Sequence, residues 1–416
     1  MKVIIANTME SGGGATRASR QLQQGLVKEG FQASRYVKRK IAADPDVHGG
    51  HCSKFLDKLT ASIDSKLLLK ILHRKRIKGV WSLNWLPNLV AGRILKMEPD
   101  LVNLHWIGHG FINISDLARI SRPFVWTLHD SWAFTGGCHL PADCNGYKHR
   151  CGNCPQLKSG REYDVSRWGH NRKQNAYDRI ASLTVVTPSR WLGECARNSA
   201  LFRDRDVKVI PNGVDHRLFC PVNKQGARLR LGLPATKKIM LYGAMGAVSD
   251  FNKGYHLLVS ALDRLSETGN DAELTVFGSR HPIASEKHGF SAHNFGMIDD
   301  DETLRDLYAA ADVMIMPSLQ ENLPFTVMES LACGTPVVAF DIGGVSDLVE
   351  HKRNGYLAQP FDSDGLAAGI EWVLSSDDTR SIMLSENART KIETEFTLDL
   401  YIKHYAELFR ELLGSS

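Results

Sequence analysis

The stretch PSLQENLPFTVMESLACGTPVV, residues 317–338, joins a strand end, a loop, a helix and the start of another strand. Pro324 suits the first helical position, because the N–H that proline lacks would have no helical partner there. Gly334 suits the helix end, and a second proline follows it. We therefore predict a loop over LQEN, a helix over residues 324–333 and a buried strand after it.

Short apolar runs alternate with helical patterns along the rest of the chain. Because a helical stretch follows each run, the pattern predicts parallel βαβ units in open, doubly wound α/β sheets. The expected strands cover residues 2–7, 101–106, 123–130, 183–189, 207–213, 238–244, 273–279, 311–318 and 335–341.

The chain has 416 residues, whereas a single core stops growing at roughly 250–300 residues. We therefore expect two Rossmann-like domains, residues 1–205 and 206–395, with an amphipathic helix in residues 396–416 packing back across them. Ligands of such sheets bind at the carboxyl ends of the strands. Two of these sheets would face each other across an interdomain cleft.

The bulk composition narrows the class of protein. A net charge of +5 over 416 residues is only mildly basic and gives no support to nucleic-acid binding. No apolar run approaches the ~20 residues that span a bilayer. The opening MKVIIANTME fits a first strand better than a signal peptide. We expect a cytoplasmic protein.

Two glutamates flank the start of the helix in the opening stretch. A helix N-terminus favours phosphate, whereas a carboxylate accepts hydrogen bonds from sugar hydroxyls. The pattern predicts a sugar joined to a diphosphate, with Glu321 on the sugar and Glu329 on a ribose diol. The segment Asn322, Leu323, Pro324 would lie at the phosphate end. The alternative is a solvated loop charge at position 321 and an exposed helix charge at position 329.

The spacing E-x7-E followed by SLACGTPVV resembles the signature of retaining glycosyltransferases with the GT-B fold. That family is usually numbered four, also called group 1, and the likeness is to its bacterial polysaccharide-biosynthesis type. VIPNGVD (209–215) resembles its entry to the donor domain, and NKGYHLL (252–258) its phosphate-binding segment. NFGMID (294–299) resembles the loop that holds the nucleobase.

The resemblance implies roles for residues of the second domain. Glu321 would contact the donor sugar and Glu329 the ribose, while Phe295 and Met297 would lie at the base. Lys253 would stabilise the departing diphosphate; the alternative is an ordinary surface lysine. The family often has another basic residue earlier in that loop, where this chain has GAMGAVSDF. Lys253 is therefore the main expected cation.

The first domain carries a glycine-rich loop and two histidines at expected strand ends. In NTMESGGGATRAS (7–19) the resemblance implies that Gly13 and Gly14 approach the donor; a plain flexible turn is the alternative. The family has a histidine matching His129, near the donor sugar, so we expect a catalytic role for it. Asp130 and His105 are assigned to the acceptor side. Structural histidines are the alternative.

Four cysteines lie in the segment CHLPADCNGYKHRCGNC. One C-x2-C pair with two further thiols matches the ligand number of structural zinc, and free thiols are the alternative. DDDE (299–302) fits a helix start, where acidic residues meet the positive end of the helix dipole, so no catalytic metal is expected. The expected zinc ligands are Cys138, Cys144, Cys151 and Cys154.

A basic segment, residues 54–78, repeats cations at four-residue spacing beside an apolar stripe. It fits either a core-packed helix with a solvated basic face or a helix on an anionic membrane surface. A polyprenyl-linked acceptor would bring the protein to the inner leaflet. The cations are Lys66, Lys70, Arg74 and Lys78.

The expected activity is retaining transfer of a hexose from a UDP- or GDP-sugar to a saccharide or polyprenyl-linked acceptor. Such a step belongs to exopolysaccharide or related glycan biosynthesis. A GT-B epimerase, a GT-B phosphorylase and a non-catalytic nucleotide-sugar-binding protein are the alternatives.

Overall fold

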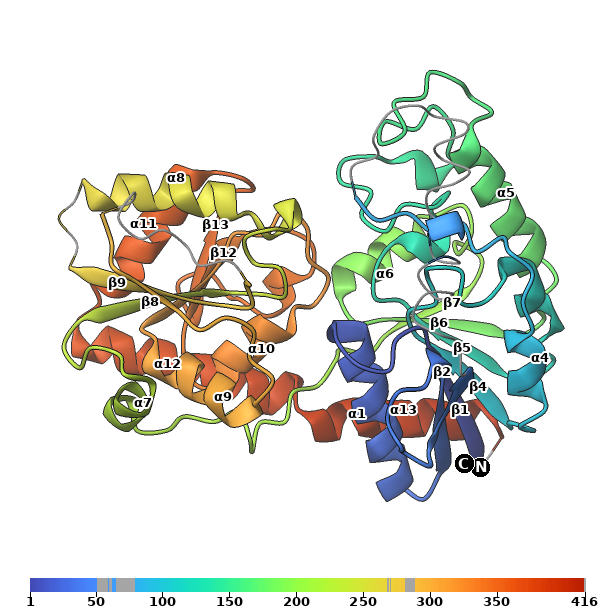
Figure 1. Cartoon of the computed structure of the whole chain (residues 1–416), viewed down its shortest axis with the longest axis horizontal. Helices are drawn as coiled ribbons and strands as arrows, with labels where there is room; N and C mark the ends of the chain where they lie inside the picture. Colours follow the sequence, from blue (N-terminus) through green and yellow to red (C-terminus); the bar gives the residue numbers. More distant parts are fainter. Residues whose placement is uncertain are drawn as a thin grey trace. The chain divides into compact units, whose positions relative to one another are not determined.

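The computed structural model describes residues 1–50, 59, 62–64, 79–267, 269, 271–280 and 289–414. The chain divides into two compact units (Figure 1). Unit 1 comprises Met1–Pro211 with Tyr401–Ser416, and unit 2 comprises Asn212–Leu400. The basic segment 54–78 lies almost wholly outside the described residues. No helix among the described residues is long and apolar enough to cross a membrane.

Unit 1 is built on a seven-stranded parallel sheet of order β3-β2-β1-β4-β5-β6-β7. The chain order reverses between β1 and β4, so this sheet has a switch point at their carboxyl ends. The strands are β1 (Lys2–Asn7), β2 (Gln32–Arg39), β3 (Val47–Gly50), β4 (Leu101–Leu104), β5 (Phe124–Thr127), β6 (Leu183–Thr187) and β7 (Asp206–Val209).

Strand β7 corrects one expectation from the sequence. We expected residues 207–213 to open the second domain, but β7 pairs with β6 and completes the first sheet, with Val207 beside Val185. The reason is packing, because Val207 is buried in the core of unit 1. The chain leaves unit 1 after Pro211, a few residues beyond the expected boundary.

The last helix, α13 (Leu398–Leu412), returns to unit 1. The Tyr401 hydroxyl donates to the Ala18 carbonyl at 3.3 Å, and the Tyr405 hydroxyl pairs with Thr127 Oγ1 at 2.7 Å. The other helices among the described residues of unit 1 are α1 (Gly14–Lys28), α4 (Val90–Leu95), α5 (Val165–Tyr177) and α6 (Arg190–Arg197), with 3₁₀ turns η2 (Ile114–Arg119), η3 (Trp132–Phe134) and η4 (Gly146–Lys148).

Unit 2 is built on a six-stranded parallel sheet of order β10-β9-β8-β11-β12-β13, with its switch point between β8 and β11. Its four central strands, β9, β8, β11 and β12, are largely buried on both faces, as is typical of parallel sheets, whereas the edge strand β10 has no buried residue. The strands of this sheet are β8 (Lys238–Gly243), β9 (Ala272–Phe277), β10 (Ala292–Asn294), β11 (Val313–Met316), β12 (Val337–Phe340) and β13 (Gly355–Ala358).

Helices cover both faces of this sheet. Figure 1 shows α8 and α11 along one face and α9, α10 and α12 along the other. The helices are α7 (Lys224–Leu231), α8 (Tyr255–Ser266), α9 (Asp301–Ala310), α10 (Phe325–Ala332), α11 (Ser363–Leu374) and α12 (Asp378–Glu395), with 3₁₀ turns η5 (Phe251–Lys253) and η7 (Val345–Asp347).

The opening stretch folds nearly as predicted. Helix α10 lies between β11 and β12, but Pro324 is its N-cap residue, with ψ of 125°, and the helix begins one residue later. Gly334 has φ of 76° and ends the helix in the left-handed conformation that favours glycine.

Helix starts differ beside the switch points. Helices α1, α8 and α10 follow β1, β8 and β11, and their N-cap residues, Gly13, Gly254 and Pro324, make no side-chain capping hydrogen bond. In six other helices a side-chain oxygen accepts from first-turn amides, whereas α4 follows Leu89 and also lacks a side-chain cap. In α9 the capping residue is Asp300, which confirms the helix start expected in DDDE. The other capping residues are Asp164, Ser189, Asn223, Asp362 and Asp377.

Candidate functional site

Two residues expected to act together meet at the switch point of unit 2. Lys253 Nζ lies 2.7 Å from Glu321 Oε1, although 68 residues separate them in sequence. Lys253 follows β8, and Glu321 follows the neighbouring strand β11. Their side chains are 22% and 15% exposed, so a ligand can reach both.

The loops that carry this pair are fastened to each other. The Leu319 amide donates to the Asn252 carbonyl at 2.8 Å, and Asn252 Nδ2 donates to the Gln320 carbonyl at 3.0 Å. A Cβ at Gly254 would lie 1.7 Å from the Pro317 carbonyl oxygen, so only glycine allows this approach. The Lys253–Glu321 contact is therefore set by the backbone.

The charge on Lys253 depends on its partner. Burial alone would lower its pKa, but the charge and hydrogen bond of Glu321 outweigh burial and raise the pKa above the ordinary value. Lys253 is therefore an ammonium at neutral pH. A bound diphosphate could take this cation, which would leave the carboxylate of Glu321 for hydroxyl groups.

Glu329 lies inside the unit and not on its surface. It is 1% exposed, and its Oε2 accepts a hydrogen bond from the Tyr308 hydroxyl at 2.8 Å. The interpretation of Glu329 as an exposed helix charge is wrong, because this face of α10 packs against α9. Its contact with a ribose stays a prediction.

The expected base loop is held to the end of β9 by its backbone. The Phe295 amide donates to the Val276 carbonyl at 2.8 Å, and the Gly278 amide donates to the Gly296 carbonyl at 2.6 Å. Phe295 packs partly against the core, whereas Met297 is 45% exposed. Of these two side chains, Met297 is the one more open to a ligand.

In unit 1, two of the predicted residues meet at adjacent strand ends. His105 follows β4 and His129 follows β5, and their ring nitrogens Nδ1 and Nε2 lie 2.9 Å apart. The rings stack with centroids 5.1 Å apart. Burial lowers the pKa of His105 well below its usual range and that of His129 to about 4, so both imidazoles are neutral at pH 7.

Asn103 determines which nitrogen of each ring carries the proton. Its Nδ2 donates to the Val125 carbonyl and to Thr127 Oγ1, so its Oδ1, 2.9 Å from His105 Nε2, must accept. His105 therefore carries its proton on Nε2 and accepts from His129 Nε2. His129 Nδ1 is left without a proton and can only accept a hydrogen bond.

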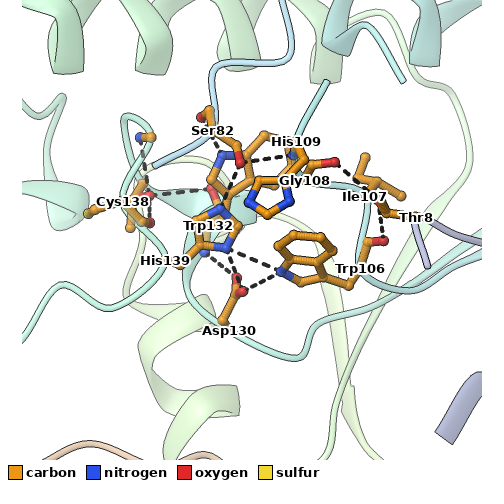
Figure 2. Close-up of polar contacts among 12 residues, drawn as sticks. Thr8, Ser82, Trp106, Ile107, Gly108, His109, Asp130, Trp132, Cys138 and His139 are labelled. Carbon is orange, nitrogen blue, oxygen red and sulfur yellow. Dashed lines mark hydrogen bonds and ion pairs between the residues drawn. The ribbon is translucent and has the colours of Figure 1, made fainter. Parts of the chain in front are cut away.

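Asp130 is held as a carboxylate beside His129. Its Oδ2 accepts from Trp106 Nε1 at 2.8 Å and lies 2.6 Å from His139 Nδ1, and its Oδ1 accepts from the Trp132 amide at 2.9 Å (Figure 2). Burial opposes ionisation, but His139 and these hydrogen bonds outweigh it and lower the pKa of Asp130. The side chain is 17% exposed.

His139 also contacts Ser82, which gives a Ser–His–Asp order of contacts. His139 Nε2 lies 3.0 Å from Ser82 Oγ (Figure 2). Ser82 is fully buried, and its Oγ accepts from the His109 amide at 3.0 Å. A nucleophile must reach its substrate, so we assign Ser82 to holding His139 in place.

Sequence reasoning did not assign site roles to Asn103, Trp106, Ser82 or His139. Their partners come from other strands and loops, and no local spacing signals them. Gly13 and Gly14 are exposed, and Gly13 has φ of 80° with nothing within 4 Å of an added Cβ. Backbone angle, and not crowding, therefore requires glycine at position 13.

The four cysteines gather around one small cavity of about 20 Å³, and all are free thiols. In the described part of the chain, no group of three or more His, Cys, Asp or Glu side chains is placed to hold a metal ion. The sulfurs thus lie near one another without forming a ready ligand set, and zinc stays a prediction. Its residues are Cys138, Cys144, Cys151 and Cys154.

Comparison with known proteins decides the family. Residues 12–218 match the model described as Glycosyltransferase Family 4, and residues 237–376 match Glycosyl transferases group 1. The chain is a glycosyltransferase of this type. An uncharacterized glycosyltransferase of Methanocaldococcus jannaschii is 27% identical over 333 residues, which is 76% of this chain and 77% of the relative.

Two relatives with more specific names match over less of their length. Sulfoquinovosyl transferase SQD2 of Arabidopsis thaliana is 30% identical over 73% of this chain and 55% of its own. D-inositol 3-phosphate glycosyltransferase of Corynebacterium diphtheriae is 32% identical over 64% of this chain and 62% of its own. The chain thus spans less than two thirds of each.

Solved structures show the same fold. Sucrose-phosphate synthase from Thermosynechococcus elongatus has a TM-score of 0.73 at 20% identity, and all of both chains is covered. HepE of Anabaena in complex with UDP-glucose has a TM-score of 0.69 at 18% identity, covering 99% of this glycosyltransferase and all of HepE. The expected fold class, two parallel-sheet α/β domains of the GT-B type, is confirmed.

Proposed function

We propose that this glycosyltransferase moves a hexose from a nucleoside diphosphate to a hydroxyl of a saccharide acceptor, with retention at the anomeric carbon. The contact between Lys253 and Glu321 carries the proposal. It brings one cation and one carboxylate together at the switch point of unit 2, and a carboxylate can accept hydrogen bonds from hydroxyl groups. A nucleotide sugar offers a diphosphate to the first and sugar hydroxyls to the second.

The surroundings of this pair fit a leaving diphosphate. Helix α10 opens without a side-chain cap beside Glu321, and its positive end favours anions. Lys253 keeps its charge and would neutralise the oxygen that develops charge as the glycosidic bond breaks. Glu321 would orient the sugar, and Glu329 would bind the ribose once the nucleotide displaces Tyr308.

In the proposed step, the bond between the anomeric carbon and the diphosphate oxygen breaks. The acceptor oxygen bonds to the same face of that carbon, and its proton passes to the departing phosphate. His129 would accept a hydrogen bond from a sugar hydroxyl through Nδ1, since that nitrogen cannot donate. Asp130 would accept one from the acceptor.

The nature of donor and acceptor belongs to the proposal. A UDP-hexose is the first donor to test, because HepE, a structure of the same fold, holds UDP-glucose; a GDP-hexose is the second. The proposed acceptor is a polyprenyl-linked saccharide at the cytoplasmic face of the membrane, in polysaccharide assembly. The basic segment 54–78 would hold the protein there.

A nucleotide-sugar panel tests the proposal. UDP-, GDP- and ADP-hexoses are added separately, and thermal unfolding, hydrolysis without acceptor and transfer to membrane extracts are measured. We expect one donor class to raise Tm and to be hydrolysed slowly, and NMR of the glycoside to show the donor's anomeric configuration. Binding without turnover would indicate a nucleotide-sugar-binding protein, and an epimerised sugar an epimerase. No response to any donor would overturn the proposal.

A further inference from the structure

A basic groove lies in unit 1, apart from the strand-end residues described above. It has a volume of about 530 Å³, within the range of small-molecule sites. Four parts of the chain supply it: the cysteine-rich loop, the segment between that loop and α5, helix α5 itself, and the turn after α6. Its lining residues are His149, Arg150, Glu162, Arg167, Gln174, Ala200 and Arg203.

Two of its three arginines are fixed by backbone carbonyls. Arg167 Nε donates to the Cys151 carbonyl at 2.9 Å, and Arg203 donates from one guanidinium nitrogen to the Lys148 carbonyl at 2.7 Å. Because only one nitrogen of each guanidinium is used in this way, other N–H groups can donate to a ligand. The backbone contact fixes the direction in which they point. An anion meeting such preoriented donors loses little side-chain entropy.

The groove carries an excess of positive charge. Its one carboxylate, Glu162, lies 3.3 Å from Arg167, so three arginines face a single acid. Like charges gathered in one groove repel each other, and an anion that bridges them removes this cost. A guanidinium group can donate two parallel hydrogen bonds to the oxygens of one phosphate. The groove therefore favours a phosphate over a neutral ligand.

A buried histidine on the same helix as two of the lining residues favours the same class of ligand. His170 lies on α5 between two lining residues, Arg167 and Gln174, at helical spacing. It is 1% exposed, and neither ring nitrogen has a hydrogen-bond partner. Burial, with Lys173, Arg167 and Arg150 nearby, lowers its pKa to about 4. A bound anion would remove part of that repulsion.

We propose that this groove binds the phosphate or diphosphate group of the acceptor. That the ligand is the acceptor rests on the glycosyl transfer proposed above. That the groove binds a phosphate follows from its own arginines and does not depend on that function. The ligand is either a soluble sugar phosphate or the headgroup of a lipid-linked saccharide. Both present the same phosphate oxygens to Arg150, Arg167 and Arg203.

Pyrophosphate binding tests the site directly. The Lys253→Met background removes the main donor-site cation, and histidine ring resonances are followed while inorganic pyrophosphate is added. We expect saturable binding that shifts the His170 signals. Arg150→Gln and Arg203→Gln should each weaken it about tenfold, which corresponds to ~1.4 kcal/mol for the loss of one hydrogen bond to a charged group. The matched control is Arg179→Gln, an exposed arginine two residues beyond the end of the same helix.

Further arms identify the source of the phosphate. A hexose phosphate in solution and vesicles with or without a polyprenyl diphosphate are compared on the same variants. Equal affinity of Arg150→Gln and the control, or unchanged His170 signals, would overturn the site. Pyrophosphate binding without any donor hydrolysis by the wild type would leave the site intact and overturn the glycosyl-transfer proposal instead.

Discussion

Lys253 in unit 2 and Lys173 in unit 1 are both largely buried, yet their pKa values shift in opposite directions. Lys253 lies 2.7 Å from the Glu321 carboxylate, and its pKa is raised. Lys173 is 2% exposed; its ammonium donates to the Thr135 and Trp132 carbonyls and lies 3.9 Å from the centre of the Trp132 ring. Burial lowers its pKa to about 7.

The difference shows how one residue type serves two purposes. A carboxylate partner keeps Lys253 charged at a site that remains partly exposed, where an incoming diphosphate can exchange with Glu321. Carbonyls and a ring cannot offset burial, so Lys173 serves to hold the backbone after β5 in place. A buried lysine is therefore a ligand-binding candidate only when its charge is kept and a ligand can reach it.

The largest expected effect is at Lys253. Lys253→Met should lower the rate of hexose transfer by about 10²–10³-fold, because removing one preorganised donor to developing charge has that effect. The unfolding midpoint should change little by comparison. Lys238, exposed at the opposite end of β8, gives the control variant Lys238→Met. Equal transfer rates in the two variants would show that Lys253 has no role in transfer, and the contrast with Lys173 would then be lost.

The next effect is at Asn103, which fixes the histidine pair. Asn103→Leu removes the acceptor of His105 Nε2 and should destabilise unit 1 by ~1–3 kcal/mol, measured by urea unfolding. Nitrogen chemical shifts should show His129 no longer held in one tautomer, and transfer should fall about tenfold. If the rate of hexose transfer stays normal while the tautomer of His129 changes, His129 has no catalytic role.

Lys173 should affect stability and not chemistry. Between pH 7 and 10 the unfolded chain binds a proton at this lysine that the folded chain does not, because the folded pKa is about 7 and the ordinary value 10.5. The free energy of unfolding should therefore rise with pH, by at most about 1.4 kcal/mol per pH unit. Below about pH 7 Lys173 is charged in both states, so the full free-energy cost of burying its charge is present.

The variant Lys173→Met isolates this contribution. The difference in unfolding free energy between wild type and variant is measured at each pH, so that other titrating groups cancel. A difference that is flat from pH 7 to 10 would mean that Lys173 stays charged when folded. In that case the contrast with Lys253 would disappear.

The smallest effect on transfer is expected from the cysteines. If they bind zinc, four sulfurs complete its coordination, and the metal has no position left for substrate. Cys144→Ser should then lose the metal and lower Tm, with transfer per folded molecule unchanged, whereas Cys195→Ser on α6 should keep it. If elemental analysis finds no metal in the fully reduced protein, the four cysteines are free thiols and the zinc prediction is wrong.

Local sequence signals predicted which residues lie together at the strand ends better in unit 2 than in unit 1. Glu321 and Lys253 each lie in the connection between an apolar strand and the next helix, and a proline or a glycine marks the start of that helix. By contrast, Asn103, His139 and Ser82 gain their roles only through partners on other strands and loops. Hydrophobic period and turn chemistry are local properties, whereas a hydrogen-bond network depends on which strands become neighbours.

Residue order was enough to predict the alternation of strand and helix, two Rossmann-like sheets and the helix end at Gly334, because these follow from backbone preferences within a few residues. Tertiary structure alone decided that β7 joins the first sheet, that Glu329 is buried against Tyr308, and that His129 presents an unprotonated Nδ1. Each of these depends on burial and on partners distant in sequence, which the order of residues along the chain does not encode locally.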